Sequence, residues 1–120
     1  MSAETPAPIT VDPEDAKIVT LARATRARNG ADEGAAVRDE TGRTYTASTV
    51  ALPSLELSAL RTAVAMAVAG GARGLEAAAI VGVGDAATDA DRAAVRDLGG
   101  AGTPILLAGP DAVVRTIATV

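Results

Sequence analysis

The chain has 120 residues, a net charge of −4 and a hydrophobic fraction of 48% with Tyr45 as its single aromatic residue, which predicts one domain with an aliphatic core. It carries no basic cluster and no set of aromatic rings on which bases could stack, so nucleic-acid binding is disfavoured. The absence of Cys and His excludes disulfides, a thiol nucleophile, an imidazole base and a zinc site of the usual Cys and His kind.

Residues 1–11 contain Pro6 and Pro8 among small polar residues, and we expect them to form a flexible tail before a single domain at 12–120. The first ten residues have neither a basic nor an apolar region of the kind found in signal peptides. No apolar run of membrane-spanning length is free of glycine or charge. We therefore expect a soluble, cytoplasmic protein with no membrane partner.

The segment "VDPEDAKIVTLARATRARNG" predicts the first helix. Asp12 is a suitable N-cap residue, Pro13 suits the first helical position, and Asn29-Gly30 is typical of a helix end. Beyond it, "EGAAVRD" and "TYTASTVAL" flank the turn sequence "ETGR", a pattern that predicts a β-hairpin.

A second helix is predicted over 57–69, ended by Gly70-Gly71. It is apolar nearly all round, which is expected of a helix in a buried interior or at an oligomer interface. Next come a buried strand in "LEAAAIVGVG", a helix in "TDADRAAVRDLGG" capped by Thr88, a buried strand in "TPILLAG", and a short final helix in "GPDAVVRTIATV". The order α-β-β-α-β-α-β-α predicts an α/β fold, a three-layer α/β/α sandwich.

Two motifs of general interest are weak. The stretch "GVGDAA" at 82–87 matches a dinucleotide-binding turn, but the chain reads "PILLAG" where a ribose-binding carboxylate is expected, so we favour a plain strand-to-helix loop. Ser54 and Ser58 have no histidine to activate them, so we interpret both as helix-cap residues rather than nucleophiles.

The segment "EGAAVRDETGRTYTASTVAL" followed by "SALRTAVAMAVAGG" resembles the cytidine deaminase family. That family carries a V-G-A-A-V hairpin strand, an N-x-E motif, C-A-E-R-x-A on a buried helix and P-C-x-x-C-R on the next helix. The residues of this chain that match these motifs are Gly34, Ala35, Ala36, Val37, Gly42, Ala59, Arg61, Thr62, Ala63 and Arg92. The resemblance implies the deaminase fold and, in the active family, zinc-dependent hydrolytic deamination of cytidine.

The family's chemical groups are replaced in this chain. Ser58 stands where the first zinc-binding cysteine lies, and Leu60 stands where the proton-shuttling glutamate lies. Thr88 and Asp91 occupy the positions of the other two cysteines, so we expect neither zinc nor any other cofactor, and no catalytic residue.

The asparagine and glutamate that hold the ribose in the family fall on Thr49 and Ala51, with a gap of uncertain position between Val50 and Ser58. These two residues are the substrate-pocket positions of the chain. Neither keeps the family's side chain, so a ribose would lose its polar clamp.

Arg61 survives from the family motif. In the family it lies beside the thiolate ligands, so without them it would need another anion if it is buried. We hypothesise that Arg61 pairs with Asp91 across the vacated metal site. The alternative is that Arg61 reaches a subunit interface while Asp91 is only a helix cap.

Three functions follow from this comparison. We favour a catalytically inactive, cytidine deaminase-like protein, a homo-oligomer (dimer or tetramer) that works as an interaction or assembly module with a protein partner still to be identified. The second is a nucleoside or small-molecule binder without turnover, which would use Thr49, Ser58, Thr88 and Asp91. The third is an active cytidine deaminase, as the overall resemblance implies.

Overall fold

The computed structural model describes residues 9–84 and 86–120. The predicted tail at 1–11 therefore lies outside the described residues as far as residue 8, and so does Asp85 of the "GVGDAA" stretch. In chain order the elements are α1 (Pro13–Asn29), β1 (Gly34–Asp39), β2 (Thr44–Ser48), β3 (Val50–Leu52), β4 (Leu55–Leu57), α2 (Ala59–Ala69), β5 (Leu75–Val81), α3 (Asp89–Gly99), β6 (Pro104–Ala108) and β7 (Val114–Thr119).

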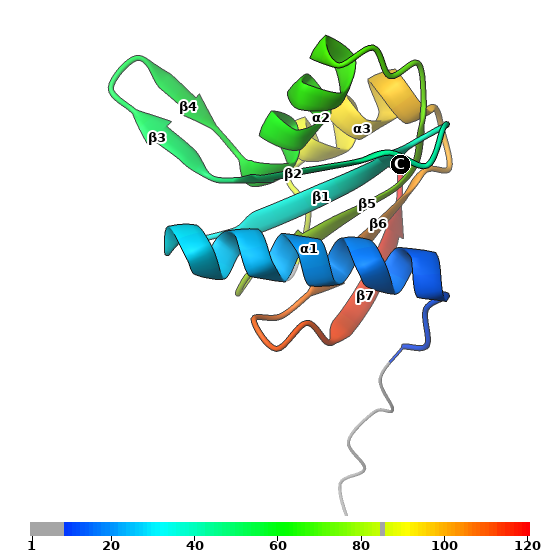
Figure 1. Cartoon of the computed structure of the whole chain (residues 1–120), viewed down its shortest axis with the longest axis horizontal. Helices are drawn as coiled ribbons and strands as arrows, with labels where there is room; N and C mark the ends of the chain where they lie inside the picture. The colour runs from blue at the N-terminus through cyan, green and yellow to red at the C-terminus, as the bar shows by residue number, and fades with distance from the viewer. Residues whose placement is uncertain (1–8, 85) are drawn as a thin grey trace, which may run out of the picture.

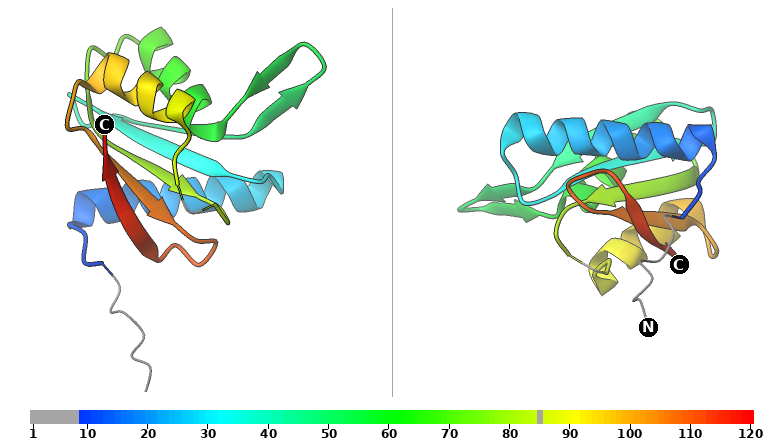
Figure 2. Two further views of the ribbon diagram at one scale, coloured as in Figure 1. Left: turned by 180° about the vertical axis from the view of Figure 1, so that it is seen from behind. Right: turned by 90° about the horizontal axis from the view of Figure 1, so that it is seen from below.

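The central layer is a five-stranded sheet in the order β2-β1-β5-β6-β7. Strands β5 and β6 are parallel, and the other neighbours are antiparallel. Helix α1 covers one face of the sheet, while α2 and α3 pack together on the other (Figures 1 and 2). This arrangement confirms the α/β/α sandwich predicted from the element order.

The two faces of the sheet carry separate cores of small aliphatic residues. On the α1 side, Ile18, Val19 and Ala22 pack against strand residues such as Leu106. On the other side, Leu60 of α2 and thirteen further buried residues form a larger cluster. On the α1 side the core has no aromatic ring and the helix lies close to the sheet, so a side chain at Gly34 would collide with the backbone of α1.

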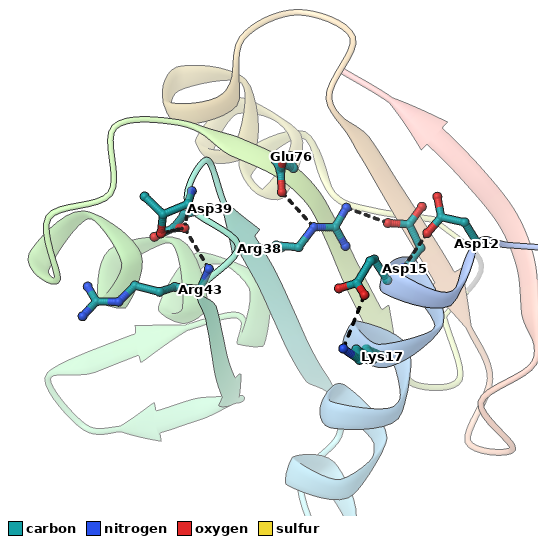
Figure 3. Close-up of polar contacts among 9 residues, drawn as sticks. Asp12, Asp15, Lys17, Arg38, Asp39, Arg43 and Glu76 are labelled. Atoms are coloured by element: carbon teal, nitrogen blue, oxygen red, sulfur yellow. Dashed lines mark hydrogen bonds and ion pairs between the residues drawn. The ribbon is translucent and has the colours of Figure 1, made fainter.

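The limits predicted for the first helix are confirmed, because the backbone N–H of Asp15 donates to Asp12 Oδ1 at 2.9 Å and Gly30 ends the helix at φ 58°. An ion-pair cluster fixes α1 to the sheet. Arg38 of β1 donates from Nη2 to Asp15 on α1 and from Nε to Glu76 on β5, each at 3.0 Å (Figure 3).

The prediction of a final helix in "GPDAVVRTIATV" is wrong, because residues 114–119 form strand β7, which pairs antiparallel with β6. The β-branched residues of this segment favour a strand. Asp111 does not start a helix: its Oδ1 accepts from the backbone N–H of Val113 at 3.0 Å and closes a turn instead.

The β-hairpin prediction is confirmed for β1 and β2, but the predicted second strand extended too far along the chain. The second strand stops at Ser48, and the chain then forms a separate two-stranded arm, β3–β4, that projects from the body (Figure 1). Leu52 and Leu55 of this arm are 56% and 49% exposed. Helix α2 consequently begins at Ala59, after the arm, rather than at residue 57.

Candidate functional site

The N-terminus of α2 carries the first position of interest, Ser58. Its backbone is extended (φ −64°, ψ 159°) and its hydroxyl oxygen accepts from the backbone N–H of Arg61 at 3.2 Å, which confirms it as the N-cap. The same hydroxyl donates to Oδ1 of Asp91 on α3 at 2.5 Å. Two of the three residues that the resemblance aligns with zinc-binding cysteines are therefore joined by a direct hydrogen bond.

The N-terminus of α3 supplies the other two positions. Thr88 is the N-cap, and its hydroxyl oxygen accepts from the backbone N–H of Asp91 at 3.1 Å. Thr88 is exposed, whereas Asp91 is only 2% exposed. The carboxylate of Asp91 does not close a capping box on its own helix, because it turns across to α2 and accepts the proton of Ser58.

The predicted ion pair between Arg61 and Asp91 is not formed. Arg61 is exposed, and no basic side chain of the described residues lies within 4.0 Å of the Asp91 carboxylate. The physical reason is that Arg61 is an exposed residue that lines the open cavity at the N-terminus of α2, so its charge does not require a buried partner. The neutral hydroxyl of Ser58 takes the place beside Asp91.

Leu60 is a core residue of α2. It is 0% exposed and belongs to the core under α2, among residues that include Ala63 and Val95. A leucine at this position gains about 2 kcal/mol from burial, which an ionised carboxylate could not. The residue that the resemblance aligns with the family's proton shuttle is therefore part of the hydrophobic core.

A cavity of about 700 Å³ opens between the end of α1, the start of β1, the arm and the N-terminus of α2. It brings together four of the residues singled out from the sequence, while Leu60, Thr88 and Asp91 do not line it. Its lining residues are Arg26, Asp32, Glu33, Thr49, Val50, Ala51, Glu56, Leu57, Ser58, Arg61, Val83 and Gly84.

Thr49, which the resemblance aligns with the ribose-binding asparagine, is hydrogen-bonded to the backbone of Glu33. Its hydroxyl oxygen accepts from the N–H of Glu33 at 3.2 Å, and its own N–H donates to the carbonyl oxygen of Glu33 at 3.2 Å. Ala51 lies on the arm and is exposed. Thr49 therefore links the end of β2 to the start of β1 through its hydrogen bonds with Glu33. Ala51 offers no polar side-chain group to a ligand.

Sequence reasoning missed the acidic side of the cavity. Asp32 and Glu33 were not among the predicted site residues, but both follow α1 in the turn before β1 and line the cavity. Burial raises the pKa of Glu33, and the negative charges of Asp91 and Asp32 raise it further. The one sequence signal that could have identified Asp32 and Glu33 as cavity residues is their place just before a buried strand.

The residues at the three ligand positions do not fit zinc. They offer two hydroxyls and one carboxylate, whereas zinc sites in proteins use cysteine, histidine and carboxylate ligands in sets of three or four. Within residues 9–84 and 86–120, no group of three His, Cys, Asp or Glu side chains is placed to hold a metal ion. The hydrogen bond between Ser58 and Asp91 also occupies the groups that would have to bind it.

The comparisons with known proteins assign the chain to a family. A family described as cytidine deaminase-like matches residues 11–112, so the chain belongs to the cytidine deaminase-like family. Its fold is similar to that of the cytidine deaminase from Burkholderia pseudomallei, with 26% identity, 86% of this chain and 90% of that chain covered, and a TM-score of 0.75.

Two mycobacterial enzymes are also similar in structure. The cytidine deaminase from Mycobacterium leprae is 22% identical, with 90% of this chain and 94% of that chain covered and a TM-score of 0.71. The enzyme from Mycobacterium tuberculosis is 25% identical, with 78% and 85% covered and a TM-score of 0.68. The search of curated protein sequences gives no match. Among the described residues, no helix is long and apolar enough to cross a membrane.

Proposed function

We propose that this chain is a cytidine deaminase-like protein that does not deaminate, and that it works as an oligomeric interaction module. The observation that carries the proposal is the hydrogen bond from Ser58 to Asp91. It joins the two helix N-termini directly, at the place where the family motifs hold a metal. Two helix caps and one buried carboxylate thus stabilise a junction that a zinc ion stabilises in the active family.

The chemistry of hydrolytic deamination supports the same proposal. The reaction needs a nucleophilic hydroxide and a group that carries protons between it and the pyrimidine ring. Leu60, at the position of that group, has no titratable atom and is fully buried. Glu33 is the cavity carboxylate with a raised pKa, but it precedes β1 and has no counterpart in the family motifs. The cavity therefore holds acids without a partner that activates water.

A second function, ligand binding without turnover, is favoured by the cavity itself. Its volume of about 700 Å³ is within the range of small-molecule sites, which is roughly 300–1,000 Å³. The cavity combines hydroxyls, carboxylates and two arginines with aliphatic walls. Such a lining suits a hydrophilic small molecule, although the family's polar clamp for the ribose is lost.

The inactive role is tested by zinc content and ammonia release. We expect purified protein, incubated with zinc and dialysed, to retain no stoichiometric metal and to release no ammonia from cytidine. The triple variant Ser58→Cys, Thr88→Cys, Asp91→Cys is the matched control, because it restores the three thiols on the same helices. It should retain about one zinc per chain. One zinc per chain in the unaltered protein, or ammonia release above background, would contradict the proposal.

The binding role is tested by thermal shift and calorimetric titration with cytidine, uridine and the free bases. Binding predicts a rise in the melting temperature that saturates with ligand concentration. Ala51→Trp, which narrows the cavity, should abolish that rise, whereas Ala101→Trp on the far loop should leave it unchanged. Absence of heat and of any shift with the whole panel would remove this second function.

A further inference from the structure

The wall of the cavity contains a half-buried carboxylate, that of Glu33. The backbone of this residue is fixed, because its N–H donates to Thr49 Oγ1 and its carbonyl oxygen accepts from the N–H of Thr49, each at 3.2 Å. Its side chain packs against the bare backbone of Gly82, where an added Cβ would lie 3.2 Å from Glu33 Cγ. The stem of Glu33 is therefore held between the end of β2 and the end of β5.

The carboxylate of Glu33 has no partner in the part of the chain that the structure describes. No basic nitrogen of residues 9–84 and 86–120 lies within 4.0 Å of it. The hydrogen bonds of Glu33, all with Thr49, use only its backbone atoms. A carboxylate that is half removed from water and lacks a donor gains from a cation that a ligand brings.

Negative charge predominates around this carboxylate. Arg26 and Arg61 also line the cavity, but Arg26 Nε donates to the carbonyl oxygen of Asp32 at 3.0 Å and Arg61 is exposed. Asp91 does not line the cavity, yet its charge reaches Glu33. The lining residues that carry a carboxylate are Asp32, Glu33 and Glu56. The cavity therefore favours a positively charged group over a neutral or negative one.

The same cavity has an aliphatic wall. Val50 and Leu57 are cross-strand partners in the β3–β4 arm, so their side chains lie on one face of it, and both line the cavity. Val83, in the loop after β5, lines it too and is 74% exposed. The arm and the last turn of α1 lie on the same side of the molecule (Figure 1). A ligand that reaches the carboxylates therefore also meets a hydrocarbon surface.

We propose that this cavity is a binding site for an aliphatic amine, with the ammonium group at the carboxylate of Glu33 and the alkyl chain against the aliphatic wall. The proposal rests on the second function proposed above, ligand binding without turnover, and names its ligand class. An ammonium has three donors and no fixed plane, so it can serve carboxylates that come from the turn before β1 and from the arm. Cytidine and uridine are uncharged at neutral pH and would not use these acids.

Calorimetric titration with pentylamine tests the ligand class, with pentanol and pentanoate as controls of the same chain length. We expect pentylamine to bind at one site per chain, and pentanol to bind more weakly by about tenfold or more, because only the ammonium forms a charge-assisted hydrogen bond. Pentanoate should not bind. Equal affinities for pentylamine and pentanol, or no binding of pentylamine, would overturn the proposal.

The variant Glu33→Gln tests the residue, because it removes the charge and keeps the shape. A half-buried carboxylate without a partner does not stabilise the fold at neutral pH, so we expect this variant to fold. It should bind pentylamine more weakly by about tenfold or more. Asp97→Asn, which removes an exposed acid of α3 outside the cavity, should bind as the natural chain does. Unchanged affinity in Glu33→Gln, or an equal loss in both variants, would overturn the proposal.

The pH dependence of pentylamine binding is a readout that a structural role of Glu33 would not give. The amine binds the ionised form of Glu33, so its affinity should fall as the pH is lowered through the raised pKa of this residue. The profile of Glu33→Gln should be flatter, and this comparison isolates Glu33 from the other charged groups around it. These groups are Arg26, Asp32, Glu56, Arg61 and Asp91. Identical profiles for the two proteins would overturn the proposal.

Two sources of an alkyl ammonium are separated by a lysine blocked at both ends, Nα-acetyl-lysine methylamide. Binding of pentylamine alone supports a free amine as the ligand, whereas binding of the blocked lysine as well supports the lysine side chain of a protein partner. If cytidine or uridine bound and pentylamine did not, the amine would be excluded and ligand binding would stand. If none of them bound, both would fail, and zinc content and ammonia release would still decide the inactive role.

Discussion

Two aspartates of this molecule are equally buried but differently surrounded. Asp39 and Asp91 are each 2% exposed. The carboxylate of Asp39 accepts from the backbone N–H of Thr41 at 2.9 Å, the hydroxyl of Thr41 at 2.7 Å, the N–H of Arg43 at 3.0 Å and the hydroxyl of Tyr45 at 3.0 Å (Figure 3 shows the bond from Arg43). The carboxylate of Asp91 accepts from Ser58 alone among the described side chains and backbone groups.

The different surroundings of the two carboxylates reflect different roles, one in the fold and one near the cavity. Burial alone would raise the pKa of Asp39, but its hydrogen bonds to Thr41, Tyr45 and Arg43 outweigh burial and lower the pKa. Asp39 therefore stabilises the turn between β1 and β2. Asp91, which the resemblance aligns with a zinc ligand, lies close enough to Glu33 for its charge to raise the pKa of that residue. The carboxylate of Asp39 thus has four donors in its turn, whereas the carboxylate of Asp91 has one and adds negative charge close to Glu33.

The largest expected effect is the loss of the Asp39 network. Asp39→Ala leaves four donors without their acceptor and removes a buried carboxylate that holds the exposed turn after β1, so we expect the melting temperature to fall by about 10 °C. Asp91→Asn is the matched control, because an amide oxygen can still accept the hydroxyl proton of Ser58. A scanning calorimeter would show the smaller drop for Asp91→Asn, and an equal or larger drop would reverse the comparison.

The next effect concerns Ser58. Ser58→Ala removes both the cap on Arg61 N–H and the donor to Asp91, so we expect a loss of about 1.5 kcal/mol in the free energy of unfolding. Ser54→Ala, at the exposed turn of the arm, should change it by less than about 0.3 kcal/mol. Urea titration measures both. If Ser58→Ala were as silent as Ser54→Ala, the junction would not hold the helices together.

The pH dependence should have opposite signs at the two carboxylates that titrate abnormally. The pKa of Asp39 is lowered on folding, so its stabilisation is complete above the unfolded value of about 3.9 and is lost as the pH falls through the folded value. The pKa of Glu33 is raised, so it costs stability above its folded value and this cost disappears as the pH falls below the unfolded value of about 4.3.

Urea titrations at several pH values would separate these two contributions. We expect Glu33→Gln to stabilise the protein at pH 7 by less than about 1 kcal/mol and to change nothing near pH 3.5. Asp39→Asn should destabilise at pH 7, and the difference from the natural chain should shrink on acidification. A Glu33→Gln variant less stable than the natural chain at pH 7 would show that the glutamate is compensated after all.

The smallest effect is expected for Arg61. Because it is exposed and forms no ion pair with Asp91, the double-mutant cycle of Arg61→Gln with Asp91→Asn should give a coupling energy within about 0.3 kcal/mol of zero. A coupling above about 1 kcal/mol would restore the pair that the sequence suggested.

The helices and the central strands could be predicted from local sequence patterns. The predictions that failed depend on contacts between residues far apart in the sequence. Asp12, Thr88 and Gly30 define helix ends through contacts within a few residues, so their roles were readable. Strand β7 was mistaken for a helix because Pro110-Asp111 also suits a helix start, and only pairing with β6 decides between the two. The β3–β4 arm escaped notice because three-residue strands carry no usable periodicity.

At the candidate site, the sequence predicted which residues lie there but not which side chains contact one another. Ser58, Thr88 and Asp91 could be located from motif spacing, but the predicted partner of Asp91 was Arg61, whereas the structure shows the hydroxyl of Ser58 in that place. Opposite charge suggested the wrong pair, because the direction of a side chain on α2 depends on how that helix packs. Asp32 and Glu33 were missed for the same reason, since only the turn after α1 aims them at the cavity.

The central claim is that helix caps and one carboxylate have replaced the metal at the junction of α2 and α3. The most direct measurement is the zinc content of the natural chain beside that of the Ser58→Cys, Thr88→Cys, Asp91→Cys variant, after the same loading and dialysis. We predict no stoichiometric zinc in the natural chain and about one per chain in the variant. One zinc in the natural chain, with a melting temperature that falls on chelation, would contradict the account.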